Sequence, residues 1–420
     1  MKVFWTLEPP SRRNLLVLFT AGLLFWSSMA SLLPTLPLYI EDVGGTTQQI
    51  GIVMGSFALG LVLCRSWLGR LADRRGRKVV LLIGMTVAAI APLGYLVVKS
   101  IPLLMLLRAF HGISIAAFTT GYSALVVDLS PVSKRGELIG YMSLVTPVGM
   151  AIGPAVGGYI QAGVGYTPLF LLSCALGAIG LVCANQVKEP RIVHETTDSS
   201  AGSSETQQFW RLLASPRLRI PALVLLLVGV AFGALSTFVP LFIKDAEVDL
   251  NPGLFYTAAA IASFISRIII GRASDRYGRG VFITGSIFSY ALAMLMLSHA
   301  YTARSFLVGG FLEGAGAGTL LPMMIALISD RSSPQERGRV FALCITGFDV
   351  GIAIAGPVLG SIAEPIGYRG MFTITTILSF LALIIFATLS SKNLSHSLRF
   401  AFGREKDVYA LNKVGLQSEA

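Results

Sequence analysis

The sequence repeats itself at a period close to half its length. Residues 65–77 read R-S-W-L-G-R-L-A-D-R-R-G-R, and residues 267–279 read R-I-I-I-G-R-A-S-D-R-Y-G-R. The same offset of about 202 residues relates further identical pairs: Gly112 and Gly314, Asp128 and Asp330, and Gly165 and Gly367. A chain of 420 residues with two copies at this spacing is a duplicated structural unit.

The duplicated unit has the composition of a membrane protein. Hydrophobic residues make up 54% of the chain and charged residues 13%, whereas a soluble domain carries about 25% charged residues. A hydrocarbon core of about 30 Å needs about 20 apolar residues per helix. Stretches of that kind predict twelve transmembrane helices: 14–40, 48–69, 79–98, 102–127, 138–161, 167–186, 220–243, 253–270, 281–299, 304–328, 339–362 and 370–391. Duplicated bundles of membrane helices are a common architecture for moving solutes across a bilayer.

The charges are distributed unequally between the two sides of these helices. The net charge of +11 comes from basic residues that the expected topology places on one side, among them residues 70–78, 134–135, 188–219 and 337–339. Acidic residues such as Glu41 and Asp42 gather on the other side. Basic loops face the cytoplasm, so the pattern predicts a multi-pass protein of the cell membrane with both termini in the cytoplasm. The basicity then reflects topology, and we expect no nucleic-acid partner.

The repeat also predicts how the chain is divided. We expect an N-terminal six-helix half at 1–186, a cytoplasmic linker at 187–219, a C-terminal six-helix half at 220–391 and a cytoplasmic tail at 392–420. The linker is polar and the tail is basic. We expect the linker to be flexible because of its polar composition, with a short surface helix possible at 209–213, and the tail to be weakly ordered because nothing obvious holds it.

Residues 69–78 read G-R-L-A-D-R-R-G-R-K and lie between the second and third expected helices. Glycines, an aspartate and basic residues at this spacing resemble the signature loop of the major facilitator superfamily, which has the form G-x-L-A-D-R-x-G-R-K. A degenerate second copy, residues 271–280, lies between helices eight and nine. The resemblance extends over nearly the whole chain and implies the fold of that family. In that fold, an all-α membrane protein has twelve transmembrane helices in two pseudo-symmetric six-helix bundles.

The resemblance implies that the signature loop is a conformational latch that stabilises the outward-facing state. Asp73 is placed to accept hydrogen bonds from a helix N-terminus, where the helix dipole favours an anion. Arg77 is placed to pair with Asp73 and with Asp128 at the end of the fourth helix. The alternative is a simple topology anchor of basic residues. The expected latch residues are Gly69, Asp73, Arg74, Gly76, Arg77, Asp128, Asp275, Arg279 and Asp330.

Four ionisable residues lie inside the expected spans and away from their ends, where charges are costly and usually functional. Arg108-Ala-Phe-His111-Gly112 is similar to an R-x-x-Q-G pattern of the family, with His111 in place of glutamine, and the similarity implies a cavity cation linked to proton coupling. The repeat offset aligns His111 with Glu313, so the two residues lie at equivalent depth on equivalent helices. Asp349 lies in the eleventh helix. Imidazoles and shielded carboxyl groups exchange protons near neutral pH. Arg108, His111, Glu313 and Asp349 are therefore the candidate proton-coupling residues.

Three of these residues have a purely structural alternative. Arg108 can join helices one and four by hydrogen bonds, His111 can bond to a carbonyl, and Glu313 can neutralise an arginine. Aromatic residues are the candidates for lining a cavity: Phe25, Trp26, Tyr122, Phe232 and Phe238.

The fifth expected helix carries a G-x-x-x-G-P-x-x-G-G pattern at Gly149, Gly153, Pro154, Gly157 and Gly158. Small residues four apart allow helix backbones to approach closely, and the proline bends the span. The pattern resembles the motif of proton-driven antiporters, above all the twelve-helix drug-efflux branch of the superfamily. The alternative is ordinary helix packing.

These features together predict a secondary active transporter. We expect proton-coupled efflux of a small organic molecule, such as a drug-like compound or metabolite, by alternating access. The alternatives are an importer or facilitator for sugars or other nutrients, and a non-transporting membrane sensor. The sequence contains no metal-ligand spacing, nucleotide loop or nucleophile triad, so we expect neither a cofactor nor an enzyme. The expected partners are the substrate, protons and the lipid bilayer, with the chain acting as a monomer.

Overall fold

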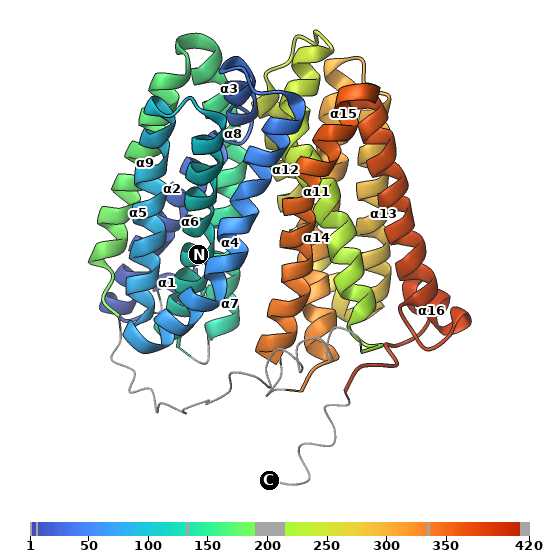
Figure 1. Ribbon diagram of the computed structural model, residues 1–420. Coiled ribbons are helices and arrows are strands. Elements are labelled where there is room, and N and C mark those ends of the chain that lie inside the picture. The colour runs from blue at the N-terminus through green and yellow to red at the C-terminus, as the bar shows by residue number, and fades with distance from the viewer. Residues whose placement is uncertain (1, 6, 132–133, 190–214, 334–336, 412–420) are drawn as a thin grey trace. The chain divides into compact units, whose positions relative to one another are not determined.

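The computed structural model describes residues 2–5, 7–131, 134–189, 215–333 and 337–411. Within these ranges the regular structure is helical (Figure 1). The helices are α1 (Lys2–Trp5), α2 (Pro9–Ser31), α3 (Leu36–Asp42), α4 (Thr47–Arg75), α5 (Arg77–Val97), α6 (Ile101–Leu129), α7 (Arg135–Met142), α8 (Val145–Val164), α9 (Tyr166–Gln186), α11 (Arg219–Asp245), α12 (Pro252–Tyr277), α13 (Arg279–Ser298), α14 (Ala303–Asp330), α15 (Arg337–Leu389) and α16 (Leu394–Ala401).

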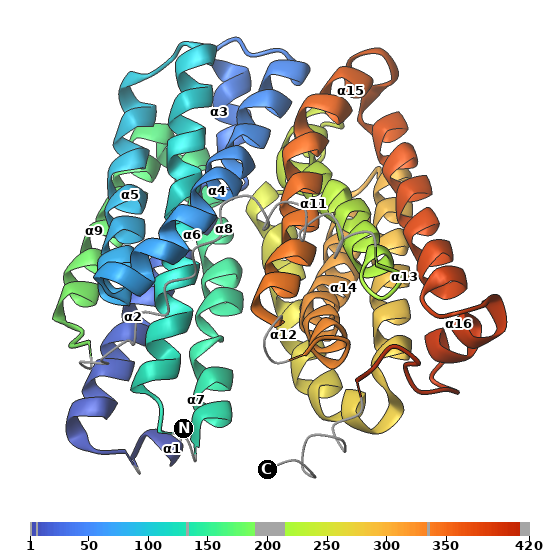
Figure 2. The same ribbon diagram turned by 60° about the horizontal axis from the view of Figure 1, so that its bottom comes forward.

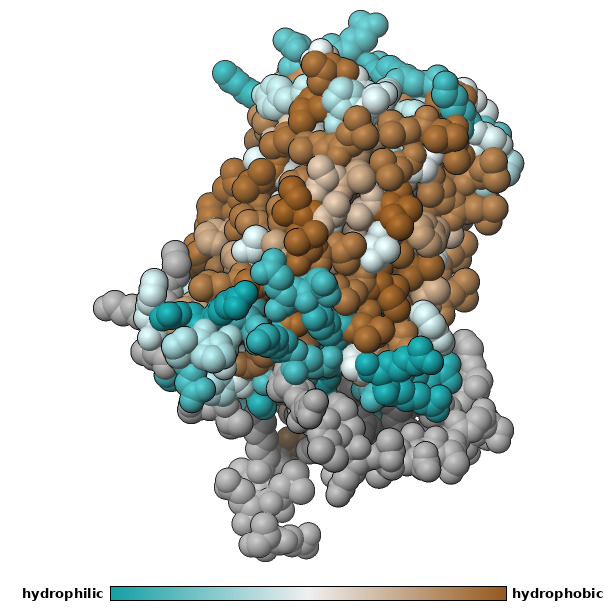
Figure 3. All heavy atoms as spheres, turned by 90° about the vertical axis from the view of Figure 1, so that its left-hand side faces the viewer, coloured by the Kyte–Doolittle hydropathy of each residue, from teal (hydrophilic) through white to brown (hydrophobic). Residues whose placement is uncertain are grey.

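The described helices confirm the predicted twelve spans. Eleven segments are long and apolar enough to cross a bilayer. The longest of them, Cys344–Leu389, contains two spans, because α15 has a non-helical residue at Gly367 (φ 71°). On the face drawn in Figure 3, hydrophobic residues form a band between hydrophilic residues at both ends, as a bilayer requires. The chain is a multi-pass membrane protein.

The repeat is visible in the backbone of the turns. Gly76 ends α4 with φ 98°, and Gly278, at the same repeat position, ends α12 with φ 85°. Gly165 (φ 88°) and Gly367 (φ 71°) form a second such pair, before the sixth and twelfth spans. Side chains with a Cβ are disfavoured at positive φ, so these glycines allow a helix to end and the next to begin without a loop. The sequence repeat thus corresponds to a repeat of sharp turns.

The chain forms two compact units, and their division does not follow the sequence halves. Unit 1 comprises Met1–Thr196, Ala234–Ala260 and Ala353–Gly367. Unit 2 comprises the described residues of Thr197–Gly233, Ile261–Ile352 and Tyr368–Ala420. The division cuts through α11, α12 and α15, since parts of these helices pack against the N-terminal repeat. The predicted boundaries at 186 and 220 describe the repeat, and they stay a prediction.

Helix contacts inside unit 1 depend on glycines. A Cβ on Gly60 of α4 would lie 1.8 Å from the carbonyl oxygen of Ala109 on α6, and one on Gly112 would lie 2.0 Å from that of Phe57. Both distances are far inside van der Waals contact, so the backbones of α4 and α6 touch directly. This crossing holds the polar part of α6 against α4.

The tail is more ordered than the sequence predicts. Described residues extend to 411 and include α16, which packs beside α13 in unit 2 (Figure 2). The carbonyl oxygen of Phe400 lies where a Cβ on Gly280 would be, at 2.1 Å, and Thr284 donates a hydrogen bond to the Ala401 carbonyl. Our expectation of a weakly ordered tail was therefore wrong for residues 394–411. The linker residues 190–214 lie outside the described residues.

Replacing Gly60 by valine is expected to destabilise the protein strongly. The added side chain would collide with backbone, which cannot rotate away, so the loss of unfolding free energy is expected to be about 3 kcal/mol or more. Thermal unfolding in detergent measures it. The matched control is Gly285→Ala in α13, because a Cβ there meets open space. Equal unfolding temperatures for the two variants would contradict the contact.

Candidate functional site

The first signature turn is held by two acidic residues of unit 1. Arg77 forms an ion pair with Asp128 at the end of α6 and donates to the Ala124 carbonyl at 3.4 Å. The backbone amides of Arg77 and Lys78 donate to the carboxylate of Glu189, at 2.7 and 3.3 Å. An anion at a helix N-terminus is favoured by the helix dipole and by the free amide groups. The N-terminus of α5 is therefore occupied by Glu189, a residue that no sequence motif had pointed to.

The other residues of the first latch group differ in their surroundings. Asp73 and Arg74 are exposed in the last turn of α4, and among the described residues Asp73 has no polar partner. Gly69 faces open space. The structure thus contains the expected Arg77–Asp128 pair, and the role of the group as a latch stays a prediction.

The second signature turn repeats the ion pair in unit 2. Arg279 Nε lies 3.4 Å from Asp330 Oδ2, and Arg279 Nη1 donates to Ser274 Oγ at 3.1 Å. Arg279 and Asp330 occupy the repeat positions of Arg77 and Asp128, so the duplication preserved the pair. The side chain of Asp275 lies outside the described part of the chain.

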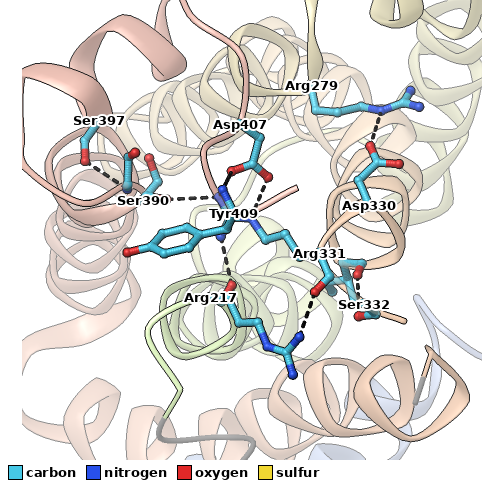
Figure 4. A network of polar contacts seen from close by, with 11 residues as sticks. Arg217, Arg279, Asp330, Arg331, Ser332, Ser390, Ser397, Asp407 and Tyr409 are labelled. Atoms are coloured by element: carbon cyan, nitrogen blue, oxygen red, sulfur yellow. Dashed lines mark hydrogen bonds and ion pairs between the residues drawn. The ribbon is translucent and has the colours of Figure 1, made fainter. Parts of the chain in front are cut away.

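Beside this pair lies a buried arginine that anchors the tail. Arg331 has 0% exposure and binds Asp407 through two contacts, Nε–Oδ2 at 2.7 Å and Nη2–Oδ1 at 2.9 Å (Figure 4). It also donates to the carbonyls of Arg217 and Ser390, at 2.8 and 3.0 Å. The backbone amide of Leu411 donates to the Asp330 carbonyl at 2.9 Å. One guanidinium therefore joins the end of α14, the start of α11 and the tail.

Two of the four candidate residues, His111 and Glu313, pair with tyrosines on the third helix of their repeat. In unit 1, His111 on α6 has 0% exposure, and its Nδ1 lies 3.1 Å from the hydroxyl of Tyr95 on α5. In unit 2, the hydroxyl of Tyr290 on α13 donates to Glu313 on α14 at 3.2 Å. The two pairs occupy equivalent helices, so each repeat holds its titratable group against a phenol. The sequence placed His111 and Glu313 at equal depth but did not identify either tyrosine.

Arg108 is buried in unit 1, and Asp349 is buried in unit 2. The Arg108 guanidinium lies 4.2 Å from the ring centroid of Phe57 on α4, a cation–π contact that is strong when shielded from water. Asp349 has 7% exposure on α15. The hydrogen bond of Glu313 goes to Tyr290 and not to Asp349. Two of the four predicted residues, Arg108 and His111, therefore lie one helical turn apart on α6 in unit 1, and the other two, Glu313 and Asp349, belong to unit 2.

The glycines of the predicted fifth span lie on α8, and they contact two different parts of the chain. Added Cβ atoms on Gly149, Gly153 and Gly157 would meet α2 atoms within 2.0–2.8 Å, so this stripe packs against α2. Gly158 instead faces Asn251, whose Oδ1 would lie 2.1 Å from an added Cβ. The Pro154 carbonyl approaches Gly253 at the start of α12 in the same way, at 2.1 Å. The pattern thus joins α8 to both α2 and α12 inside unit 1.

Unit 1 also contains a cavity of about 220 Å³ between α2, α6, α7 and α8. Its wall combines aromatic rings with hydroxyl groups: Trp26, Phe118, Tyr122, Thr119, Ser123 and Thr146. No charged residue lines it. Of the five aromatic candidates, Trp26 and Tyr122 reach this cavity, whereas Phe25 and Phe238 are fully buried in helix contacts. An uncharged wall of this kind accommodates an apolar or aromatic molecule with a few polar groups.

Comparison with known proteins places the chain in a family. The family model of the Major Facilitator Superfamily matches residues 18–296 and 247–412. The chain belongs to the major facilitator superfamily. It is a membrane transporter and not an enzyme.

Its curated relatives in the superfamily include drug-resistance proteins. The multidrug resistance protein MdtG of Escherichia coli O81 (strain ED1a) is 27% identical over 390 residues, which cover 88% of this chain and 92% of the relative. The same protein of Escherichia coli O1:K1 / APEC is 27% identical over 384 residues, covering 87% and 91%. These relatives do not favour the sugar importer or the membrane sensor as alternatives.

Solved structures of the superfamily share the fold at low identity. A mutant of the nucleoside transporter NupG superposes with a TM-score of 0.78 at 14% identity, covering 88% of this chain and 98% of that one. The human organic anion transporter MFSD10 superposes with a TM-score of 0.68 at 20% identity, covering 90% and 100%. At these identities the likeness shows the fold alone.

Replacing Asp407 by asparagine is expected to release the tail. The buried Arg331 would lose its carboxylate, and leaving such a charge uncompensated costs about 3–5 kcal/mol, which favours undocking of the tail. Hydrogen exchange measures the result as lost protection of α16. Lys406→Gln, an exposed neighbour, is the control. Unchanged protection in Asp407→Asn would show that Arg331 does not hold the tail.

Proposed function

We propose that this transporter exports a small organic molecule, a drug-like compound or metabolite, in exchange for protons. It works as a monomer by alternating access, with both termini in the cytoplasm. The observation that carries the proposal is the uncharged aromatic cavity in unit 1, considered together with the name of the MdtG relatives. The name of these relatives refers to resistance against many drugs, and an apolar wall with scattered hydroxyls suits chemically diverse compounds.

Proton coupling is assigned to Glu313. This carboxyl group has 6% exposure in the middle of α14, and among the described residues its hydrogen-bond partner is the phenol of Tyr290. A carboxyl group buried in a span is expensive to keep unless it serves the transport cycle. A single neutral donor can stabilise it without cancelling its charge, so gain or loss of a proton changes the net charge of unit 2.

The remaining site residues receive supporting roles. Arg108 and His111 hold a polar centre in unit 1, and Asp349 is the second candidate for proton binding. The pairs Arg77–Asp128 and Arg279–Asp330 bias the conformational equilibrium from the signature turns. The glycines of α8 support the antiporter assignment through their spacing, and their contacts also serve packing.

The test is proton movement in inverted membrane vesicles with an imposed pH difference. Addition of an amphiphilic aromatic cation from a panel is expected to dissipate the pH difference in vesicles carrying the parent protein. Glu313→Gln is expected to abolish this response, because the amide cannot release a proton. Uptake of the same labelled compound is measured in parallel.

Glu137→Gln is the matched control, since Glu137 is an exposed carboxylate in α7 and lies outside the proposed site. Its response should equal that of the parent. Transport of the compound without proton movement, unchanged in Glu313→Gln, would replace antiport by facilitated diffusion. Loss of the response in Asp349→Asn but not in Glu313→Gln would move the proton to Asp349.

A further inference from the structure

A group of charged residues joins the two sequence repeats at the end of unit 1 that lies away from the signature turn. Lys244, in the last turn of α11, contacts two acids in the last turn of α3: Nζ lies 2.7 Å from Glu41 Oε2 and 3.2 Å from Asp42 Oδ1. Tyr166, the first residue of α9, donates from its hydroxyl to Asp42 Oδ2 at 2.6 Å. Lys244 belongs to the second repeat, whereas its partners belong to the first.

Two helix crossings in unit 1 lie at the same end and also join the repeats. An added Cβ on Gly51 of α4 would lie 2.0 Å from the Gly356 carbonyl of α15, and the reverse distance is also 2.0 Å. The backbone amide of Gln48 donates to Glu364 at 3.2 Å. On α8, Gly158 lies against the side chain of Asn251, whose Oδ1 would be 2.1 Å from an added Cβ. The backbone contact of Gly51 with Gly356 and the contact of Gly158 with Asn251 therefore close this end.

Alternating access requires these contacts to separate once in each transport cycle. The glycine crossings hold the backbones together by packing. The ion pairs add an electrostatic attraction between the repeats, because Lys244 lies between two adjacent acids. Lys244, Glu41 and Asp42 are 54%, 36% and 45% exposed, so water replaces their contacts readily when they part. Ion pairs this exposed are weak enough to favour the closed state of this end and still separate in each transport cycle.

We propose that Lys244, Glu41 and Asp42 form an ion-pair gate that favours the closed state of this end. When the gate is closed, Lys244 also neutralises the repulsion between the two acids. Reversing the charge of Lys244 leaves three negative side chains together and shifts the population towards the open state. The gate requires alternating access, and it requires neither proton coupling nor a particular direction of transport.

Disulfide trapping tests the gate without substrate or a proton gradient. Gly158→Cys and Asn251→Cys place two thiols where an added Cβ is 2.1 Å from the neighbouring side chain. The four native cysteines, Cys64, Cys174, Cys183 and Cys344, are replaced by alanine. A protease site inserted between residues 200 and 201 separates the fragments unless the disulfide has formed. The rate of disulfide formation under mild oxidation then reports the closed population.

Lys244→Glu is expected to slow disulfide formation about two- to fivefold, the range of exposed ion pairs. Adding Glu41→Lys re-creates a pair of opposite charge and is expected to restore the parent rate. Lys99→Glu makes the same charge change in the loop between α5 and α6, where the lysine is exposed, and should leave the rate unchanged. Thermal unfolding of each variant confirms that it is folded, and Lys244→Gln substitutes for Lys244→Glu if that variant does not fold.

Three outcomes would overturn the gate. The rate of disulfide formation in Lys244→Glu could equal the parent rate. The rate in Lys99→Glu could fall as much as the rate in Lys244→Glu, or adding Glu41→Lys to Lys244→Glu could fail to restore the parent rate. None of these outcomes bears on Glu313 or on proton exchange, which the vesicle experiment addresses. Conversely, loss of antiport would leave the trapping result intact.

Discussion

Direct contact between helix backbones is the constraint on which the rest of this structure depends. In a bilayer, apolar side chains gain little by leaving lipid for protein, so helices associate through close packing and polar contacts. Gly60 and Gly112 bring α4 against α6, and three glycines of α8 bring it against α2. Once these distances are set, the directions of the polar side chains are set as well. Arg108 reaches Phe57, and the neighbouring turn of α6 faces Tyr95, because α6 cannot rotate on α4.

The duplication was the most reliable guide from sequence to structure. It related Gly76 to Gly278 and Arg77–Asp128 to Arg279–Asp330, and in both cases the backbone and the ion pair recur. Such features are local: a turn depends on one φ angle, and the pair joins residues at neighbouring helix ends. A sequence repeat preserves local features even where the rest of the helices has diverged.

Contacts across helices could not be predicted in the same way. Hydropathy gives the depth of a residue in a span, but the rotation of the helix decides which neighbour it meets. The repeat therefore related the depth of His111 to that of Glu313, but it did not identify their partners Tyr95 and Tyr290. Phe25 was expected at a cavity, whereas its ring stacks on that of Phe118 with 3.8 Å between the centroids. Arg331 had the sequence context of any basic residue beside a span. Its carboxylate partner Asp407 lies 76 residues further along the chain, beyond any local pattern.

The two repeats have kept one arrangement and changed its charge. In unit 1, Arg108 precedes His111 by one helical turn, so a proton on the imidazole would add a second positive charge beside the guanidinium. In unit 2, the repeat position of Arg108 is Gly310, and Glu313 has the phenol of Tyr290 in place of a cation.

A proton on Glu313 therefore removes a charge and meets no opposing one, whereas a proton on His111 adds to a charge that is permanent. Under the proposed function, the same pair of helices provides a fixed cation in one repeat and an anion that gains and loses a proton in the other. This difference supports the proposal that the C-terminal repeat carries the proton.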